Sequence, residues 1–270
     1  MFKIQTRNKI APQGLDLFGR DTYEVASEIP SPDALLLRSY KLPIDEIGSS
    51  VKAIGRAGAG VNNIPVDACT ARGIVVFNTP GANANSVKEL VIAGLLLSSR
   101  QIHEGMNWVS EQSADDNLAT NVEKGKSSFA GSEISGKKLG VVGLGAIGVL
   151  VANVAIDLGM EVFGYDPFIS VTAAWGLSSK VKRCESLDQL VGTCDYMTLH
   201  IPLTPDTKNL INAQKLKRAN TGLRILNFSR EGLVDTAAVR MALKDGTVSR
   251  YITDFPVPEL LGDEIGRAHV

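Results

Sequence analysis

A glycine-rich turn between two predicted strands limits most strongly what this chain can fold into. Residues 139–142 form an apolar run short enough to be a buried strand, and residues 143–148 follow a G-x-G-x-x-G pattern. Apolar residues then recur at helical spacing from 147 to 158, and residues 161–165 have the pattern of a second strand. This order predicts the βαβ unit of a dinucleotide-binding sheet.

Each glycine of the turn has its own predicted purpose. Gly143 allows the tight turn, Gly145 leaves room for a pyrophosphate at the backbone, and Gly148 lets the helix pack closely on the strand. The N-terminus of that helix offers unpaired N–H groups to phosphates. We therefore expect a dinucleotide to bind at this turn.

The identity of the dinucleotide follows from Asp166, at the end of the second predicted strand. It lies 18 residues after Gly148 and can accept hydrogen bonds from both hydroxyls of an adenosine ribose. A 2′-phosphate would be repelled by its carboxylate, and the neighbouring Phe168 and Ile169 supply no arginine. The sequence thus predicts NAD rather than NADP.

Composition excludes several other classes of protein. The 270 residues are 44% hydrophobic and carry a net charge of −1, which argues against nucleic-acid or anionic-membrane partners. The most apolar window, 90–97, is too short to span a bilayer, and the first residues lack the apolar core of a signal peptide. Three cysteines without C-x-x-C spacing favour reduced thiols, so we expect a cytoplasmic protein with no metal site.

The first 82 residues alternate strand and helix patterns, which predicts a small parallel α/β domain. The predicted strands are 3–5, 23–25, 34–37, 51–54 and 74–77, and the predicted helices are 12–18 and 66–72. Arg38 and Ser39 follow one strand, and Gly58-Ala59-Gly60 follow another. Backbone N–H groups in that loop could receive a carboxylate or phosphate, although a flexible turn explains the pattern equally well. An arginine such as Arg38 is more often solvated than bound to a ligand, but its place at the carboxyl end of a strand favours a ligand contact.

Turn residues at 78–85 mark the expected hinge to a second domain. Residues 86–89, Ser-Val-Lys-Glu, form a capping box that would open a helix to about residue 100, and residues 101–135 have only helix and loop character. A second capping box is expected at 186–189. Further strands are predicted at 196–199, 223–228 and 250–253, with a helix at 236–244. The fold class is therefore α/β, with a doubly wound parallel sheet of about six strands.

Polar residues follow three of these strands, where open α/β sheets bind ligands. Arg230 could bind the carboxylate of a 2-oxo acid and polarise the adjacent carbonyl group, and Glu259 could hold a catalytic histidine. Both could equally be solvated loop charges. For His200, followed closely by Pro202, we favour contact with the cofactor over catalysis.

Taken together, these segments resemble the D-isomer-specific 2-hydroxyacid dehydrogenase family over residues 3–262. The resemblance rests on the blocks 32–39, 55–64, 77–83, 143–148, 200–207, 227–235 and 253–255. It implies a Rossmann-type NAD domain and a smaller flavodoxin-like substrate domain. The reaction that it implies is hydride transfer from C2 of 3-phospho-D-glycerate to NAD, at the start of serine biosynthesis. Glyoxylate, hydroxypyruvate or D-lactate as substrates, or an NAD(H)-sensing corepressor-like interaction protein, are the alternatives.

The resemblance also implies roles for single residues. Arg230 would bind the substrate carboxylate, Glu259 would pair with the catalytic histidine, and Asp254 would hold the nicotinamide carboxamide. Arg38, Ser39, Gly58, Ala59 and Gly60 would face the substrate. The cofactor would contact Thr79, Gly143, Gly145, Ala146, Ile147, Gly148, Asp166, His200, Pro202, Phe228, Ser229, Arg230 and Asp254. Family members are commonly homodimers or homotetramers, joined through the region of the crossover helix.

The chain departs from the family after Glu259. The family's H-x-x-G/A element with the catalytic histidine, and the helix that follows it, have no counterpart here, since His269 lies only ten residues beyond Glu259. Residues 264–270 resemble a translated sequencing adapter, so our hypothesis is that the natural sequence ends near Asp263 and that the last seven residues are an assembly artefact. We thus expect a partial substrate domain at 1–82, an NAD domain at 83–263, a non-native tail at 264–270, and little turnover from this chain.

Overall fold

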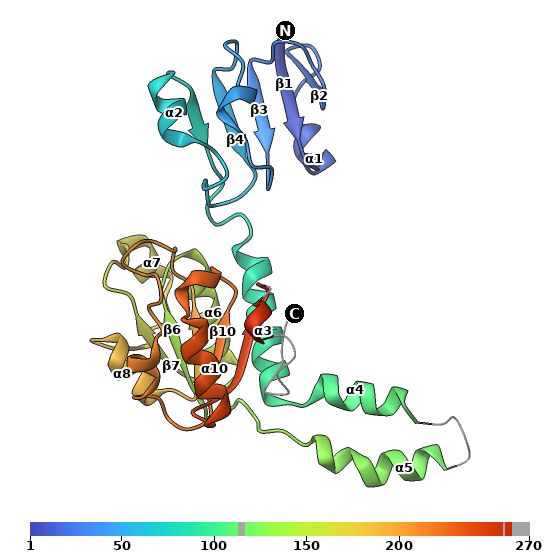
Figure 1. Cartoon of the computed structure of the whole chain (residues 1–270), viewed down its shortest axis with the longest axis vertical. Coiled ribbons are helices and arrows are strands. Elements are labelled where there is room, and N and C mark those ends of the chain that lie inside the picture. The colour runs from blue at the N-terminus through green and yellow to red at the C-terminus, as the bar shows by residue number, and fades with distance from the viewer. Residues whose placement is uncertain (113–116, 256, 261–270) are drawn as a thin grey trace. The chain divides into compact units, whose positions relative to one another are not determined.

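The computed structural model describes residues 1–112, 117–255 and 257–260, and the chain divides into two compact units (Figure 1). Unit 1 is Met1–Asn83 and unit 2 is Ala84–Val270. Each unit is built on its own parallel sheet with helices against it. This architecture confirms the predicted α/β fold class.

Unit 1 has a five-stranded sheet in the order β2-β1-β3-β4-β5, with every pair parallel. This 2-1-3-4-5 order is that of flavodoxin-like folds. The strands are β1 (Phe2–Arg7), β2 (Tyr23–Ala26), β3 (Ala34–Leu37), β4 (Ala53–Arg56) and β5 (Val75–Phe77). The helical segments are α1 (Pro12–Leu15), η1 (Ile44–Glu46) and α2 (Val66–Ala71).

The two faces of this sheet are covered unequally. Successive residues of a strand point to opposite faces, so Leu35 and Leu37 enter the core together with Cys69 of α2. On the other face, Leu36 is only half-buried and the side chain of Phe77 is 60% exposed. Helix α1 is shorter than the predicted 12–18, so it covers less of that face than we expected.

Unit 2 has a six-stranded parallel sheet in the order β11-β10-β9-β6-β7-β8. If β6 to β11 are counted as strands 1 to 6 and the sheet is read from β8, the order is 3-2-1-4-5-6, which is that of dinucleotide-binding sheets. The strands are β6 (Lys138–Val142), β7 (Glu161–Tyr165), β8 (Lys182–Arg183), β9 (Tyr196–Leu199), β10 (Leu223–Asn227) and β11 (Val248–Thr253). The order places the end of β6 beside that of β9, at the switch point where ligands bind.

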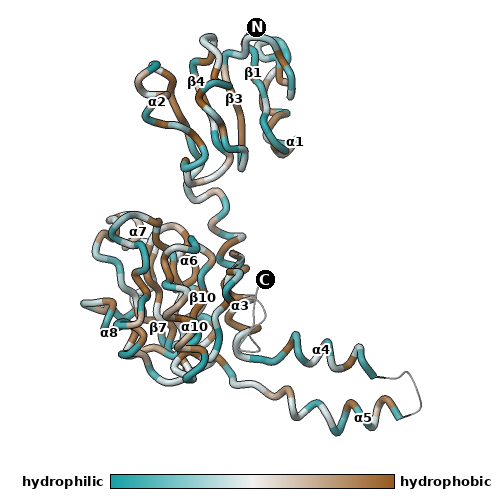
Figure 2. The backbone as a smooth tube through the Cα atoms, in the orientation of Figure 1, coloured by the Kyte–Doolittle hydropathy of each residue, from teal (hydrophilic) through white to brown (hydrophobic). Residues whose placement is uncertain are grey.

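Helices cover both faces of this sheet. Helix α3 (Ala84–Ser99) and α6 (Ala146–Asp157) pack on the face that carries Tyr196 and Leu226. On the face of Met197 and Ile225 lie α8 (Leu187–Thr193), α9 (Ala213–Leu216) and α10 (Thr236–Lys244). Since both faces are buried, the central strands are almost continuously apolar rather than alternating, and the hydrophobic segments in Figure 2 follow them.

Between α3 and β6 the chain forms an arm of two helices, as Figure 1 shows. The arm comprises α4 (Ile102–Ser110), α5 (Leu118–Gly125) and η2 (Lys126–Phe129). The rings of Trp108 and Phe129 pack with their centroids 5.4 Å apart. Other apolar side chains of α4 remain exposed, including Ile102, Met106 and Val109.

The two predicted capping boxes have different outcomes. The second is confirmed at its N-cap, because the Ser186 side chain accepts a hydrogen bond from the Gln189 N–H at 3.2 Å. The first is wrong: α3 begins at Ala84, which is buried, so packing extends the helix past the expected Ser86 cap. Asn85 there donates to Glu89 instead. The sequence also failed to indicate α7 (Val171–Gly176) and β8.

No helix in the described ranges is both long enough and apolar enough to cross a membrane. The same residues hold no cluster of three or more His, Cys, Asp or Glu side chains suited to a metal ion.

Candidate functional site

The glycine turn after β6 has little room at two of its glycines and open space at the third. Gly143 has φ +90°, and a Cβ there would lie 2.6 Å from the His200 carbonyl oxygen. A Cβ on Gly148 would lie 1.9 Å from the Gly143 carbonyl oxygen, so α6 contacts the turn backbone to backbone. A Cβ on Gly145 would meet nothing within 4 Å, which leaves space for a ligand.

The first turn of α6 presents free donors to that space. Gly145 is the N-cap residue, no side chain caps the helix, and the N–H groups of Ala146 and Ile147 have no partner among the described residues. Gly145 and Ala146 are exposed. The partial positive charge of the helix N-terminus would therefore favour a bound pyrophosphate.

Asp166 is held rigidly beside this turn. One carboxylate oxygen accepts the Leu144 N–H at 2.8 Å and the other accepts the Phe168 N–H at 2.8 Å. Each oxygen keeps acceptor capacity for a ribose hydroxyl. The side chain also lines a cavity of about 290 Å³ with Leu144, Gly164, Pro167, Ile169, Leu177, Val181 and Arg183.

Arg183 is a residue of this cavity that sequence reasoning missed. Strand β8 pairs with β7 so that Arg183 lies opposite Gly164, two residues before Asp166. It makes an ion pair with Glu185 at 3.1 Å. No signal in the sequence indicates this position, because β8 is only two residues long. An arginine thus lines the same cavity as Asp166, although none follows Asp166 directly in the chain.

His200, at the end of β9, is tied to the edge of the sheet through both its backbone and its ring. Its backbone N–H donates to the Val142 carbonyl at 2.7 Å, and its ring Nε2 lies 3.0 Å from Thr198 Oγ1. Burial lowers the pKa of His200 to about 4, so the ring is neutral near pH 7. The exposed Pro202 follows, with its carbonyl accepting from Thr207 Oγ1 at 2.7 Å.

The residues after β10 point in different directions. Phe228 turns its side chain into the core against α3, so any contact with a cofactor would use its backbone. The Ser229 hydroxyl donates to the Ile201 carbonyl at 3.0 Å, which joins the loops after β9 and β10. Arg230 is exposed, and its Nη1 donates to the Ser229 carbonyl at 2.6 Å.

The last strand ends at Asp254 and Glu259. Partial burial raises the pKa of Asp254, and the positive charge of Arg230 partly offsets that rise. Glu259 lies in η4 (Pro258–Leu260), is exposed, and has no hydrogen bond or ion pair within the described ranges. His103 instead contacts Asn107 on α4, and His269 lies outside the described residues.

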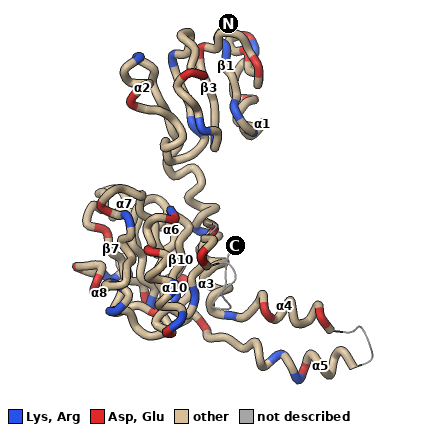
Figure 3. Tube along the Cα trace, in the orientation of Figure 1, with Lys and Arg blue, Asp and Glu red and all other residues tan. Residues whose placement is uncertain are grey.

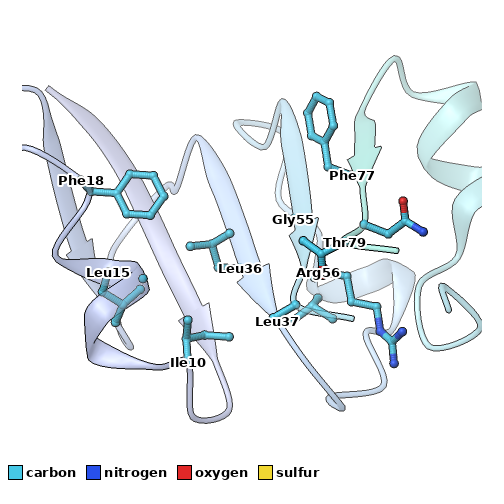
Figure 4. Close-up of a pocket in the computed structure, with 12 residues that line it drawn as sticks. Ile10, Leu15, Phe18, Leu36, Leu37, Gly55, Arg56, Phe77 and Thr79 are labelled. Atoms are coloured by element: carbon cyan, nitrogen blue, oxygen red, sulfur yellow. The ribbon is translucent and has the colours of Figure 1, made fainter. Parts of the chain in front are cut away.

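In unit 1 the predicted substrate residues all follow the carboxyl ends of strands, and basic residues lie at this edge of the sheet (Figure 3). Arg38 and Ser39 come after β3, and Gly58-Ala59-Gly60 come after β4. Thr79, which was predicted to contact the cofactor, follows β5. A mainly apolar cavity of about 210 Å³ lies beside them. Figure 4 shows Arg56 and Thr79 at its rim, with Leu36, Gly55 and Phe77 along the open face of the sheet.

The contrast between Gly145 and Gly148 gives a matched test of the turn. We expect Gly145→Ala to keep the melting temperature, because nothing opposes its Cβ, but to weaken NAD binding at least about tenfold by blocking the pyrophosphate. Gly148→Ala should instead lower the free energy of unfolding by about 1–3 kcal/mol, because α6 must move away from β6. Calorimetry with NAD and urea unfolding measure the two effects. Wild-type NAD affinity in Gly145→Ala would refute the role of the turn.

The placement of Arg183 gives a second prediction. Asp166→Asn removes the charge that repels a 2′-phosphate and keeps one of the two hydrogen bonds from the Leu144 and Phe168 N–H groups, since an amide has a single acceptor oxygen. The ratio of NADP to NAD affinity should therefore rise at least about tenfold. Adding Arg183→Ala should reverse much of that gain, since it removes the cation. An unchanged ratio in Asp166→Asn would show that this carboxylate does not select the cofactor.

Comparison with known proteins identifies the family. The model of the D-isomer specific 2-hydroxyacid dehydrogenase NAD binding domain matches residues 92–265. The chain is 39% identical over 233 residues to D-3-phosphoglycerate dehydrogenase of Mycobacterium leprae, covering 85% of this chain and 42% of that protein. It is 36% identical over 276 residues to the protein of the same name from Synechocystis, covering 97% and 48%.

Solved structures agree with this match. The TT0316 protein from Thermus thermophilus superposes with a TM-score of 0.78 at 25% identity, over 97% of this chain and 85% of that one. The NAD⁺-bound 3-phosphoglycerate dehydrogenase of Entamoeba histolytica gives 0.74 at 27% identity, over 97% and 83%. The chain spans less than half the length of the curated relatives it matches. It belongs to the D-isomer-specific 2-hydroxyacid dehydrogenase family, and the cofactor of its Rossmann-type unit is NAD.

Proposed function

We propose that the protein to which this chain belongs oxidises 3-phospho-D-glycerate to 3-phosphohydroxypyruvate with NAD, as the first step of serine biosynthesis. The observation that carries the proposal is the dinucleotide turn with Asp166 fixed beside it, in a unit where Arg230 and Asp254 follow the ends of the neighbouring strands β10 and β11. The names of the curated relatives support phosphoglycerate as the substrate. Basic strand ends in unit 1 suit a substrate with two anionic groups.

Different residues of this chain would carry out different parts of such a reaction. Bound NAD supplies the acceptor for the hydride that leaves C2 of the substrate. The N–H groups of Ala146 and Ile147 would hold its pyrophosphate, Asp166 its ribose, and Asp254 its carboxamide. Arg230, exposed and fixed at the Ser229 carbonyl, would bind the substrate carboxylate and polarise the developing carbonyl group.

Two other functions remain to be separated from this one. Solved structures of D-lactate and D-mandelate dehydrogenases share the fold, so another 2-hydroxy acid is the first alternative. An NAD(H)-sensing interaction protein is the second. NADH formation by the full-length gene product should be fast with 3-phosphoglycerate and slow with D-lactate. The reverse order would favour the first alternative, and no turnover with any 2-hydroxy acid would favour the second.

The 270-residue chain itself should turn over little. Neither described histidine forms a hydrogen bond or ion pair with Glu259. His103 instead contacts Asn107, and the neutral His200 contacts Thr198. With no described histidine placed beside Glu259 to act as general acid and base, we expect a rate at least roughly a hundred to ten thousand times lower than that of the full-length enzyme. Steady-state NADH formation by the two proteins measures the difference. Comparable rates would refute this expectation.

We also propose that a second copy of the chain covers the arm, which agrees with the homodimers or homotetramers that the family resemblance implies. Ile102, Met106 and Val109 expose apolar surface on α4, beside a cavity of about 570 Å³ between the arm helices. Exposed apolar surface of this kind marks interaction sites.

This arrangement predicts an effect of Met106→Glu on assembly. The charge would be buried in the contact, so the variant should be monomeric at concentrations where the wild type is a dimer. Met241→Glu on α10 is the control, because Met241 is 64% exposed against 68% for Met106. Sedimentation velocity measures both, and a Met106→Glu dimer as stable as the wild type would refute the contact.

A cytoplasmic location is part of the same proposal. All three cysteines are unpaired and buried. Burial raises the pKa of the Cys194 thiol to about 12, so it is unreactive near pH 7. Unpaired thiols of this kind suit a reducing compartment.

A further inference from the structure

The loop Gly58-Ala59-Gly60 after β4 has all three of its carbonyl groups tied back to unit 1. The Gly58 carbonyl accepts the Thr79 N–H at 3.0 Å, and the Ala59 carbonyl accepts Asn78 Nδ2 at 2.6 Å. The Gly60 carbonyl accepts Nη1 of Arg56. Such a loop is fixed by its neighbours and is no flexible turn.

Fixing the carbonyls also sets the direction of the N–H groups. In a trans peptide the C=O and the next N–H point in opposite directions, so the Ala59 and Gly60 N–H groups turn away from the side that holds the carbonyls. Neither has a partner among the described residues, and Ala59 is exposed. Consecutive free N–H groups form an anion-binding concavity.

Arg56 is the central support of this arrangement. Its Nε donates to the Arg38 carbonyl at 3.1 Å while its Nη1 donates to the Gly60 carbonyl, so one guanidinium links the end of β3 to the loop after β4. A Cβ on Gly58 would lie 3.0 Å from Nη1, which shows that the guanidinium lies directly under the loop. Thr79 adds a second support, because its Oγ1 accepts the Gly58 N–H at 2.8 Å.

Arg38 differs from Arg56 in this respect. Its side chain is exposed and makes no hydrogen bond or ion pair within the described ranges, whereas its carbonyl accepts from Arg56 and from Asn63 Nδ2. The two arginines at neighbouring strand ends therefore have different environments. One is built into the backbone of the loop, and the other is available to a ligand.

We propose that Arg56 is a positioning residue that holds the Gly58–Gly60 loop in its anion-binding form, while the side chain of the neighbouring Arg38 stays available to the ligand. The identity of the ligand rests on the proposed function, whereas the support of the loop does not. Lysine cannot replace Arg56, because a single ammonium group lacks the planar fork that reaches two carbonyls from fixed directions.

The test uses ¹⁵N-labelled whole chain and amide spectra of Ala59 and Gly60. Both signals should shift on titration with 3-phosphoglycerate and with D-glycerate, which shares the carboxylate and lacks the phosphate. Arg56→Lys should weaken both compounds about tenfold by loosening the loop. Arg38→Ala should weaken 3-phosphoglycerate about tenfold and D-glycerate less than about twofold.

A ligand-free readout and a matched control keep the two parts of the proposal separate. Amide exchange at Gly58 should become about tenfold faster in Arg56→Lys, because the bonds that hold the loop loosen. Arg72→Lys is the control, since Arg72 also donates to backbone carbonyls in unit 1, at Ile47 and Gly48, yet lies outside the loop. It should leave both titrations and the Gly58 exchange unchanged.

Each other result contradicts one part of the proposal. If Arg56→Lys weakens the binding of 3-phosphoglycerate but not of D-glycerate, Arg56 is itself a phosphate ligand. If the substitution changes neither the binding of the two compounds nor amide exchange at Gly58, Arg56 does not support the loop. If neither compound moves the wild-type loop signals while exchange still rises in Arg56→Lys, the support stands and the proposed substrate is wrong.

Discussion

The structure depends on the close contact between α6 and the turn after β6. With a Cβ on Gly148 only 1.9 Å from the Gly143 carbonyl oxygen, no residue but glycine fits there without moving the helix. This contact lets Val149 and Val151 of α6 join the core with Val141 of β6. It also points the free N–H groups of the first helical turn toward the space that Gly145 leaves open. The close contact between α6 and the turn after β6 thus determines both the packing of the helix and the recognition of a ligand.

Both units use the same physical arrangement for recognition. In each sheet the parallel strands end at one edge, and loops from neighbouring strands are joined there by hydrogen bonds from side chains to backbone. Asp166 holds the Leu144 N–H in unit 2, and Thr79 holds the Gly58 N–H in unit 1. In both cases the fixed backbone leaves nearby N–H groups unpaired, which suits anionic ligands. Polar side chains at these edges therefore prepare the backbone for binding as well as contacting a ligand.

The sequence indicated most of the fold because its signals are local. The strands Ala34–Leu37 and Tyr196–Leu199 and the helix Thr236–Lys244 have the predicted bounds, since apolar runs and turn residues delimit them. The helix α3 begins earlier than its capping box suggested, because burial of Ala84 is a tertiary effect. Strand β8, only two residues long, gives no periodicity to detect.

The arrangement of the candidate site was harder to predict from the sequence than the fold. Glycine roles and Asp166 follow from spacing, but the direction of a side chain depends on packing that spacing does not encode. Phe228 turns into the core, Arg183 reaches the Asp166 cavity through strand pairing, and Arg56 folds beneath its own loop. The central claim, that one helix start and one carboxylate hold NAD, is tested most directly by a crystal structure of the chain with NAD. We predict the pyrophosphate over Gly145 and the adenosine ribose on Asp166. A well-folded chain with NAD bound elsewhere, or not bound at saturating concentration, would contradict the account.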